Sequence, residues 1–138
     1  MIPQNVIVFI RDESSEKLLL AYRRDEPFVH RLNGVSGKMK EGETPTVAAS
    51  RKLAEEFGLV INPDTLTTRG VVHTGAGNLW VVIGVFNIYA ATNQQRHQRT
   101  FLDLNTNWGR ENVAPNLKWL VNLAFDPDVM DGFEVTQR

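Results

Sequence analysis

Two adjacent carboxylates near the end of a predicted helix offer the clearest chemistry in this sequence. Glu55 and Glu56 fall in the last turn of residues 45–57, where the helix macrodipole is negative. The basic pair Arg51 and Lys52 precedes them, which is the weaker order for ion pairs along a helix. A divalent cation at this end would offset both penalties, because hard cations such as Mg²⁺ bind carboxylate oxygens together with substrate phosphates. Taken alone, the same charges would also suit an ordinary solvated helix face.

The helix that carries these charges has well-marked ends. Thr44 is suited to the N-cap position, Pro45 to the first helical position, and Gly58 to the position that ends the helix. Helical periodicity assigns the core-facing side to Val47, Leu53, Ala54 and Phe57.

The other elements that must position this helix are predominantly strands. Strands are predicted at 5–11, 17–23, 66–74, 79–91, 99–104 and 133–136, and a second helix at 116–125. Turn residues separate neighbouring strands at 12–15 and 75–78, and a polar loop spans 24–33. Strands mixed with two helices predict an α+β fold in which helices cover both faces of a sheet.

The composition narrows the class of protein. The chain has 138 residues, 42% hydrophobic and 22% charged, which suits one globular domain over 1–138. Its net charge of -1 gives no basic excess for a nucleic-acid or membrane partner. Cysteine is absent, which excludes disulfides and thiolate catalysis and suits a reducing cytosol. The first residues lack the features of a secretory signal, and we expect a cytoplasmic protein.

The spacing of residues 37–59 resembles the box motif of the Nudix superfamily of diphosphate hydrolases. In that motif a glycine is followed, after five residues, by a glutamate, and seven residues later by Arg-Glu-U-x-Glu-Glu-x-Gly-U, where U is aliphatic. Eight of the nine fixed positions match, and Lys52 is the mismatch. Six of the matches are not aliphatic positions, and with one mismatch allowed they would coincide by chance with a probability on the order of 10⁻⁴.

The resemblance implies an α/β/α sandwich with a mixed sheet and a loop-helix-loop site. It implies that Mg²⁺, or Mn²⁺ in its place, assists the attack of water on a nucleoside triphosphate or another nucleoside diphosphate derivative. By motif position, Glu55 and Glu56 would bind the metal together with the backbone carbonyl of Gly37. Arg51 would pair with Glu43 and orient the site, a task that suits a bidentate arginine.

Lys52 is the main departure, because the motif has a metal-binding glutamate at that position. The stretch 93–99, where relatives often supply another acidic ligand, also has no carboxylate. The leading interpretation is Mg²⁺-dependent hydrolysis of a nucleoside triphosphate or related derivative, attenuated by Lys52, and three further accounts are open. The enzyme is rewired, with Lys52 on the phosphate and a base among Glu41, Glu55, Glu56 and His97. Alternatively, the domain binds a nucleotide without turnover, as a sensor or interaction module, or it has lost the pocket and binds proteins. A plain surface pairing of Lys52 with Glu56 is compatible with each.

Further positions are similar to the MutT-like branch of the family, which acts on oxidised purine nucleoside triphosphates. Asn33 would read the base, Arg23 would contact the phosphates, and Lys38 would be a further substrate-binding residue. Each has an ordinary alternative, as a turn residue for Asn33 and a strand-end arginine for Arg23. Aromatic candidates for stacking on the base are Phe28 and Trp119, although Trp119 suits the core better. Asn116-Leu117 stands where that branch has an acidic pair, which argues against specificity for oxidised purines.

Overall fold

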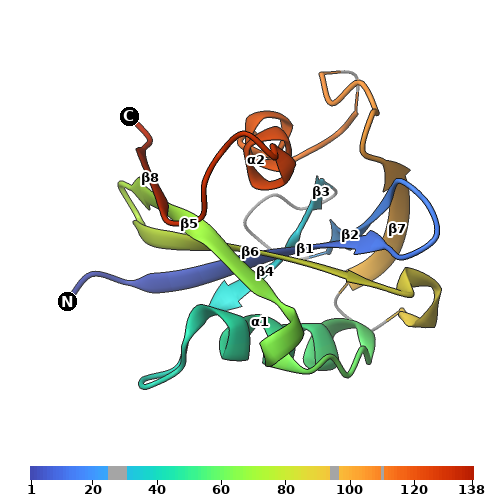
Figure 1. Ribbon diagram of the computed structural model, residues 1–138, viewed down its shortest axis with the longest axis horizontal. Helices are drawn as coiled ribbons and strands as arrows, with labels where there is room; N and C mark the ends of the chain where they lie inside the picture. The colour runs from blue at the N-terminus through green and yellow to red at the C-terminus, as the bar shows by residue number, and fades with distance from the viewer. Residues whose placement is uncertain (25–30, 94–96, 110) are drawn as a thin grey trace.

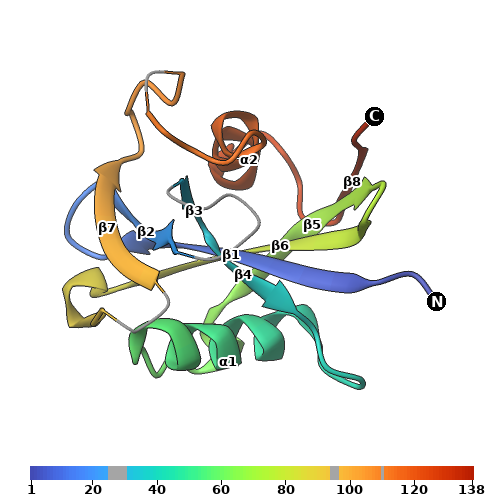
Figure 2. The same cartoon turned by 180° about the vertical axis from the view of Figure 1, so that it is seen from behind.

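A mixed β-sheet separates two α-helices in the computed structural model, which describes residues 1–24, 31–93, 97–109 and 111–138 (Figure 1). In this part of the chain, α1 (Pro45–Phe57) and α2 (Leu117–Phe125) cover opposite faces of the sheet, as the view from behind also shows (Figure 2). The strands are β1 (Gln4–Asp12), β2 (Lys17–Arg23), β3 (Leu32–Asn33), β4 (Val35–Lys38), β5 (Thr67–Thr74), β6 (Gly77–Phe86), β7 (His97–Asp103) and β8 (Phe133–Thr136). This arrangement confirms the predicted α+β sandwich.

The order of the strands brings distant segments of the chain to the middle of the sheet. The order is β3-β2-β1-β6-β5-β8, with β4 paired to β1 and β7 paired to β2. The pairs β1–β6 and β5–β8 are parallel and the other pairs are antiparallel, so the sheet is mixed. In the β1–β4 pair, Gly37 lies opposite Val6, which places the loop that precedes α1 beside the central strand.

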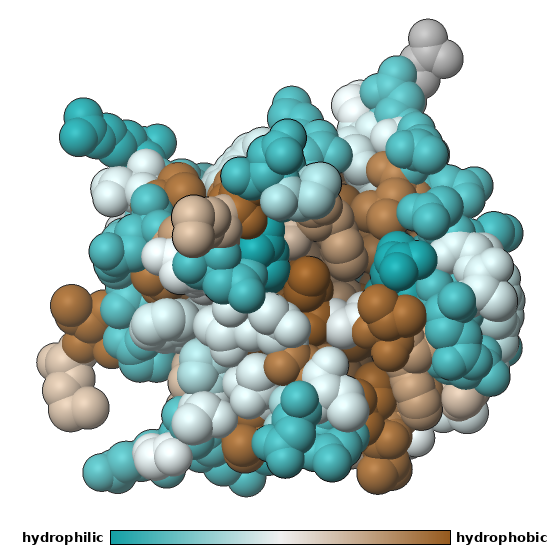
Figure 3. All heavy atoms as spheres, in the orientation of Figure 1, coloured by the Kyte–Doolittle hydropathy of each residue, from teal (hydrophilic) through white to brown (hydrophobic). Residues whose placement is uncertain are grey.

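The apolar run in β1 is continuous because both faces of this strand are covered. Val6 and Val8 pack in the core on the α1 side, whereas Ile7 and Phe9 pack in the core on the α2 side. All four side chains are at most 1% exposed. Successive residues of a strand point to opposite faces, so one helix on each face requires an unbroken apolar strand between them. Apolar residues still reach the surface at several places, among polar ones (Figure 3).

Helix α1 has the predicted ends but a different buried face. The hydroxyl of Thr44 accepts from the backbone N–H of Val47, and Gly58 ends the helix in the left-handed conformation at φ 65°. The buried residues are Ala48, Ala49, Leu53 and Phe57. Val47 is 43% exposed and Ala54 also faces solvent, so the prediction was wrong for these two residues. Lys52 and Glu56 are half-buried instead, and the Lys52 side chain lies against Gly37 of β4.

We expect Gly58→Ala to lower the stability of the protein by about 1 kcal/mol, because a Cβ is disfavoured in the left-handed region. The control is Gly75→Ala, since a Cβ at Gly75 would meet no heavy atom within 4 Å and no strained φ is present there. Thermal unfolding should show a lower Tm, by about 3–5 °C, for the first variant only. Equal Tm values for the two variants would contradict the role of Gly58 as the helix terminator.

Several local predictions differ from the structure. The short strands β3 and β4 were not predicted, because two and four residues carry too weak an alternation to detect. The predicted strand 79–91 ends at Phe86, and a 3-10 helix, η2 (Ile88–Ala90), follows it. A second 3-10 helix, η1 (Pro63–Thr65), precedes β5. Phe28 lies outside the described residues. No helix in the described part of the chain is long and apolar enough to span a lipid bilayer.

Arg69 is a buried charge that ties the C-terminal segment to the sheet. Its guanidinium donates to the backbone carbonyls of Ala124, Asp126 and Val129, and it pairs with the carboxylate of Asp131. Only 8% of Arg69 is exposed, so these partners satisfy a charge that would otherwise be costly to bury. These contacts of Arg69 fix the connection between α2 and β8 and thereby determine the position of the C-terminal residues.

Candidate functional site

The structure contains the ion pair between Arg51 and Glu43 that the motif predicts. Nε of Arg51 lies 2.8 Å from Oε2 of Glu43, and Nη2 lies 2.9 Å from Oε1. The same guanidinium donates to the backbone carbonyl of Lys38 at 3.0 Å and to Glu55 at 3.1 Å. The hydrogen bond from Arg51 lowers the pKa of Glu43 to about 2, well below its usual value. Arg51 therefore holds the loop before α1 against the helix.

The ammonium of Lys52 lies between the two carboxylates proposed as metal ligands. Its Nζ is 3.1 Å from Oε1 of Glu56 and 3.5 Å from Oε2 of Glu55. The side chain also crosses Gly37, because a Cβ built there would lie 2.5 Å from Cε of Lys52 and 3.0 Å from Nζ. Only 17% of the Lys52 side chain is exposed. The lysine therefore folds back into the site.

Glu56 has a second basic neighbour, which arrives from a distant part of the sheet. Nε2 of His97 lies 3.3 Å from Oε2 of Glu56, and both side chains are largely buried. The pairing of β7 with β2 places His97 opposite Arg23 and hence beside the site. The sequence indicated His97 only as one possible base, and no local pattern predicts this contact.

The described residues do not fit a resident divalent cation in this arrangement. Each of the four carboxylate oxygens of Glu55 and Glu56 already faces a basic group, namely Arg51, Lys52 or His97. No group of three or more His, Cys, Asp or Glu side chains suited to a metal occurs in the described part of the chain. Divalent ions such as Mg²⁺ favour several anionic or neutral oxygens, and an ammonium among them opposes such binding.

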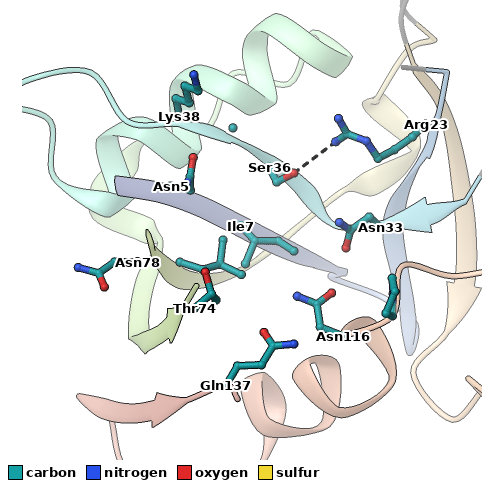
Figure 4. A pocket seen from close by; sticks show the side chains of 13 residues that line it. Asn5, Ile7, Arg23, Asn33, Ser36, Lys38, Thr74, Asn78, Asn116 and Gln137 are labelled. Carbon is teal, nitrogen blue, oxygen red and sulfur yellow. Dashed lines mark hydrogen bonds between the residues drawn. The ribbon is translucent and has the colours of Figure 1, made fainter. Parts of the chain in front are cut away.

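A cleft runs from this cluster to the opposite helix. Its first part, which we call the amide end, is a hollow of about 610 Å³, within the usual size of a small-molecule site. Its polar lining is rich in amide side chains, namely Asn5, Asn33, Asn78, Asn116 and Gln137. Figure 4 shows Asn33 entering from the sheet and Asn116 from the start of α2.

The second part, which we call the cationic end, adjoins α1 and shares four lining residues with the first. It is lined by the basic residues Arg23, Lys38, Lys40, Arg51 and Lys52, together with Glu56 and His97. Arg23 also donates a long hydrogen bond of 3.4 Å to the hydroxyl of Ser36 (Figure 4). Two of the predicted substrate-binding residues, Arg23 and Lys38, therefore lie where the two ends meet.

Two amides of the cleft have hydrogen-bonding capacity that the fold does not use. Asn33 is buried, and its Oδ1 accepts the backbone N–H of Gly34 at 2.9 Å, which leaves the side-chain NH₂ for other partners. Asn116 stands at the N-cap of α2 but makes no side-chain capping bond. Its Oδ1 is buried and has no hydrogen-bond partner among the described residues. A buried acceptor without a partner is costly, which suggests that a ligand satisfies it.

Trp119 is not brought together with these residues. It is half-buried, packs against the core on the α2 side, and lines a separate hollow with Trp108 and Lys118. The structure instead brings in Asn5, Thr74, Asn78 and Gln137, which the sequence did not single out. Gln137 follows β8, whose parallel pairing with β5 has no local sequence signal.

Comparisons with known proteins agree with this fold. A family model described as NUDIX domain matches residues 1–111. Among solved structures, a MutT/nudix family protein from Enterococcus faecalis superposes with a TM-score of 0.69 at 16% identity, over 91% of this chain and 61% of that chain. The chain thus spans about three fifths of that protein's length. No curated protein sequence matches the chain.

Two further structures have a similar fold. A MutT protein from Methanosarcina mazei Go1 has a TM-score of 0.68 at 16% identity, over 87% of this chain and 90% of that chain. The NUDIX domain of Shewanella oneidensis NrtR, solved with ADP ribose, has a TM-score of 0.67 at 17% identity, over 90% of this chain and 86% of that chain. Identities this low show the fold alone.

Proposed function

The chain belongs to the Nudix family, whose members generally hydrolyse diphosphate bonds with divalent metal ions, and from this premise we propose that it binds a nucleoside diphosphate derivative in the cleft. The base or its equivalent occupies the amide end, and the diphosphate occupies the cationic end. We expect slow hydrolysis of common nucleoside triphosphates, because the ammonium of Lys52 neutralises the carboxylates that bind the metal ion in this family.

The polarity of the cleft is the observation that carries this proposal. Neutral amides line one end and five basic side chains line the other, with Glu56 as the only carboxylate there among the described residues. A nucleoside diphosphate has the matching polarity, since its base offers donors and acceptors and its phosphates are anionic. A protein of similar fold was solved with ADP ribose, which is a ligand of this class.

The second candidate is a domain that binds the nucleotide without turnover, as a sensor or interaction module. The contacts of Lys52 and His97 with Glu56 favour it, because they engage the carboxylate that would serve as metal ligand or base. The two candidates share the binding step and differ in chemistry alone.

A panel of nucleotides and nucleoside diphosphate derivatives, assayed with Mg²⁺ and with Mn²⁺, separates these candidates. Slow release of phosphate or pyrophosphate supports the attenuated hydrolase. Binding by calorimetry without any release selects the binding domain. Neither binding nor release for any member of the panel would contradict the proposed function.

Replacement of Asn116 by alanine should weaken binding without destabilising the fold. The variant removes a buried acceptor that has no partner among the described residues, so stability should stay equal or rise by about 1 kcal/mol. The Kd of the tightest-binding nucleotide of the panel should increase about tenfold, as expected for the loss of one good hydrogen bond. Calorimetry and thermal unfolding measure the two effects.

Asn122→Ala is the matched control, because Asn122 lies on the same helix but outside the cleft and donates to the carbonyl of Lys118. Its nucleotide affinity should be that of the wild type. An Asn116→Ala protein that binds as tightly as this control would show that the amide end does not hold the ligand.

A further inference from the structure

We propose that the Lys52 ammonium takes the place of the metal ion in this chain, so that the cationic end binds a diphosphate group without a divalent cation. The inference rests on the proposed function, since it states how the same cleft holds the phosphates of its ligand. It differs from that function in its central claim, which is independence from metal.

The position of Lys52 is the first argument. Its Nζ contacts Glu56 at 3.1 Å and Glu55 at 3.5 Å, and its side chain lies against Gly37. These are the three residues that the motif would assign to the metal. The positive charge of the lysine therefore sits among the groups that would otherwise surround the ion. Gly37 permits this approach, because a Cβ at that position would collide with the lysine side chain.

The hydrogen-bonding capacity of the ammonium is the second argument. An ammonium has three N–H donors, and the contacts with Glu55 and Glu56 use two of them. The third is available to an oxygen that enters the cationic end, which Lys52 lines. Because the side chain is only 17% exposed, water screens its charge poorly, which strengthens the attraction between the ammonium and a phosphate oxygen in contact with it. A lysine acts on phosphate as a compact point charge.

The charge around Lys52 is the third argument. The chain as a whole has a net charge of -1, so the gathering of five basic side chains at one end of the cleft does not follow from composition. Glu43 and Glu55 compensate Arg51, whereas Lys38 and Lys40 add further positive charge near Lys52. A carboxylate in place of Lys52 would remove two units of positive charge, which equals the charge that a divalent cation brings. Lysine at this position therefore replaces both the ligand and the ion.

Calorimetric titration of the full chain with inorganic pyrophosphate and with ADP, in EDTA and in Mg²⁺, tests this inference. The wild type should bind both probes with Kd values that differ by no more than about threefold between the two buffers. Lys52→Met should weaken binding in EDTA by about tenfold or more, as expected for a lost charge-assisted hydrogen bond. Lys52→Arg should retain most of the affinity, because it keeps the charge.

Lys118→Met serves as the control, because Lys118 is exposed on α2 and lines a different hollow. Its affinity should equal that of the wild type, and thermal unfolding verifies that every variant is folded. Wild-type binding in Mg²⁺ alone would overturn the inference and leave the proposed function standing. Binding in EDTA that Lys52→Met leaves unchanged, or binding of ADP without pyrophosphate, would also overturn it. Failure of both probes in both buffers would overturn the inference and the proposed function together.

Discussion

Lys52→Glu should raise the rate of Mg²⁺-dependent hydrolysis of the best nucleotide by at least about tenfold, because metal assistance and general-base help are each worth orders of magnitude in rate. The substitution removes the ammonium that now contacts Glu55 and Glu56 and places a third carboxylate beside Gly37. The site then offers oxygens that a hard cation prefers. The rate should remain below that of a fully active enzyme for two reasons. His97 still contacts Glu56, and the neighbouring positions Gln98 and Arg99 supply no further carboxylate for the metal.

Lys118→Glu is the control for this experiment, since it makes the same change of charge on the exposed side of α2. Its rate of phosphate release should equal that of the wild type. If Lys52→Glu instead lowers a robust wild-type activity, then the lysine is a working catalytic or phosphate-binding group of a rewired enzyme. The picture of an attenuated site would be wrong.

Arg51→Ala should destabilise the fold by about 3 kcal/mol, the lower end of the range expected when one partner of a buried ion pair is removed. The loss includes two bonds to Glu43, one bond to Glu55 and one bond to the carbonyl of Lys38. The Glu43 side chain is only 12% exposed, so its charge would remain poorly solvated. The Tm should fall by about 10 °C.

Arg11→Ala is the control, because Arg11 forms a more exposed ion pair with Glu16 at 3.6 Å. Such pairs contribute at most about 1 kcal/mol, so the Tm of this variant should change little. Equal Tm values for Arg51→Ala and the wild type would contradict the structural role of Arg51.

The pair of Arg51 with Glu43 also predicts a dependence of stability on pH. The pKa of Glu43 falls from 4.5 to about 2 in the folded protein, so its stabilising contribution is fully present above pH 4.5 and is lost as the pH falls toward 2. Chemical unfolding should show that the wild type is less stable at pH 3 than at pH 6. The lower pH lies about one pH unit above the pKa of Glu43 in the folded protein. Arg51→Ala should show a smaller loss over the same interval, and an equal loss would contradict the assignment.

The sequence predicted the features of this site that depend on local spacing. Thr44 and Gly58 mark the two ends of α1 by their own backbone and capping preferences. The ion pair of Glu43 with Arg51 was implied by the resemblance of residues 37–59 to the Nudix box, in which these two positions pair. These features need no knowledge of the rest of the fold.

The remaining features depend on contacts between distant segments and could not be predicted in this way. His97 reaches Glu56 only because β7 pairs with β2, and Gln137 reaches the cleft only because β8 pairs with β5. The sequence allowed Lys52 to be either a surface residue or a phosphate ligand. The contact of the Lys52 side chain with Gly37 depends on the pairing of β4 with β1, which the sequence did not predict.

A crystal structure of the wild type with ADP and Mn²⁺ tests the central claim most directly. We expect the diphosphate in the cationic end, with an oxygen about 2.7–3.2 Å from Nζ of Lys52, and the base in the amide end beside Asn33 and Asn116. We expect no Mn²⁺ in contact with Glu55 or Glu56. The opposite result would be an anomalous peak at about 2.0–2.6 Å from both carboxylates, with Lys52 displaced toward solvent. That result would restore the metal to the site and contradict the assignment of its role to Lys52.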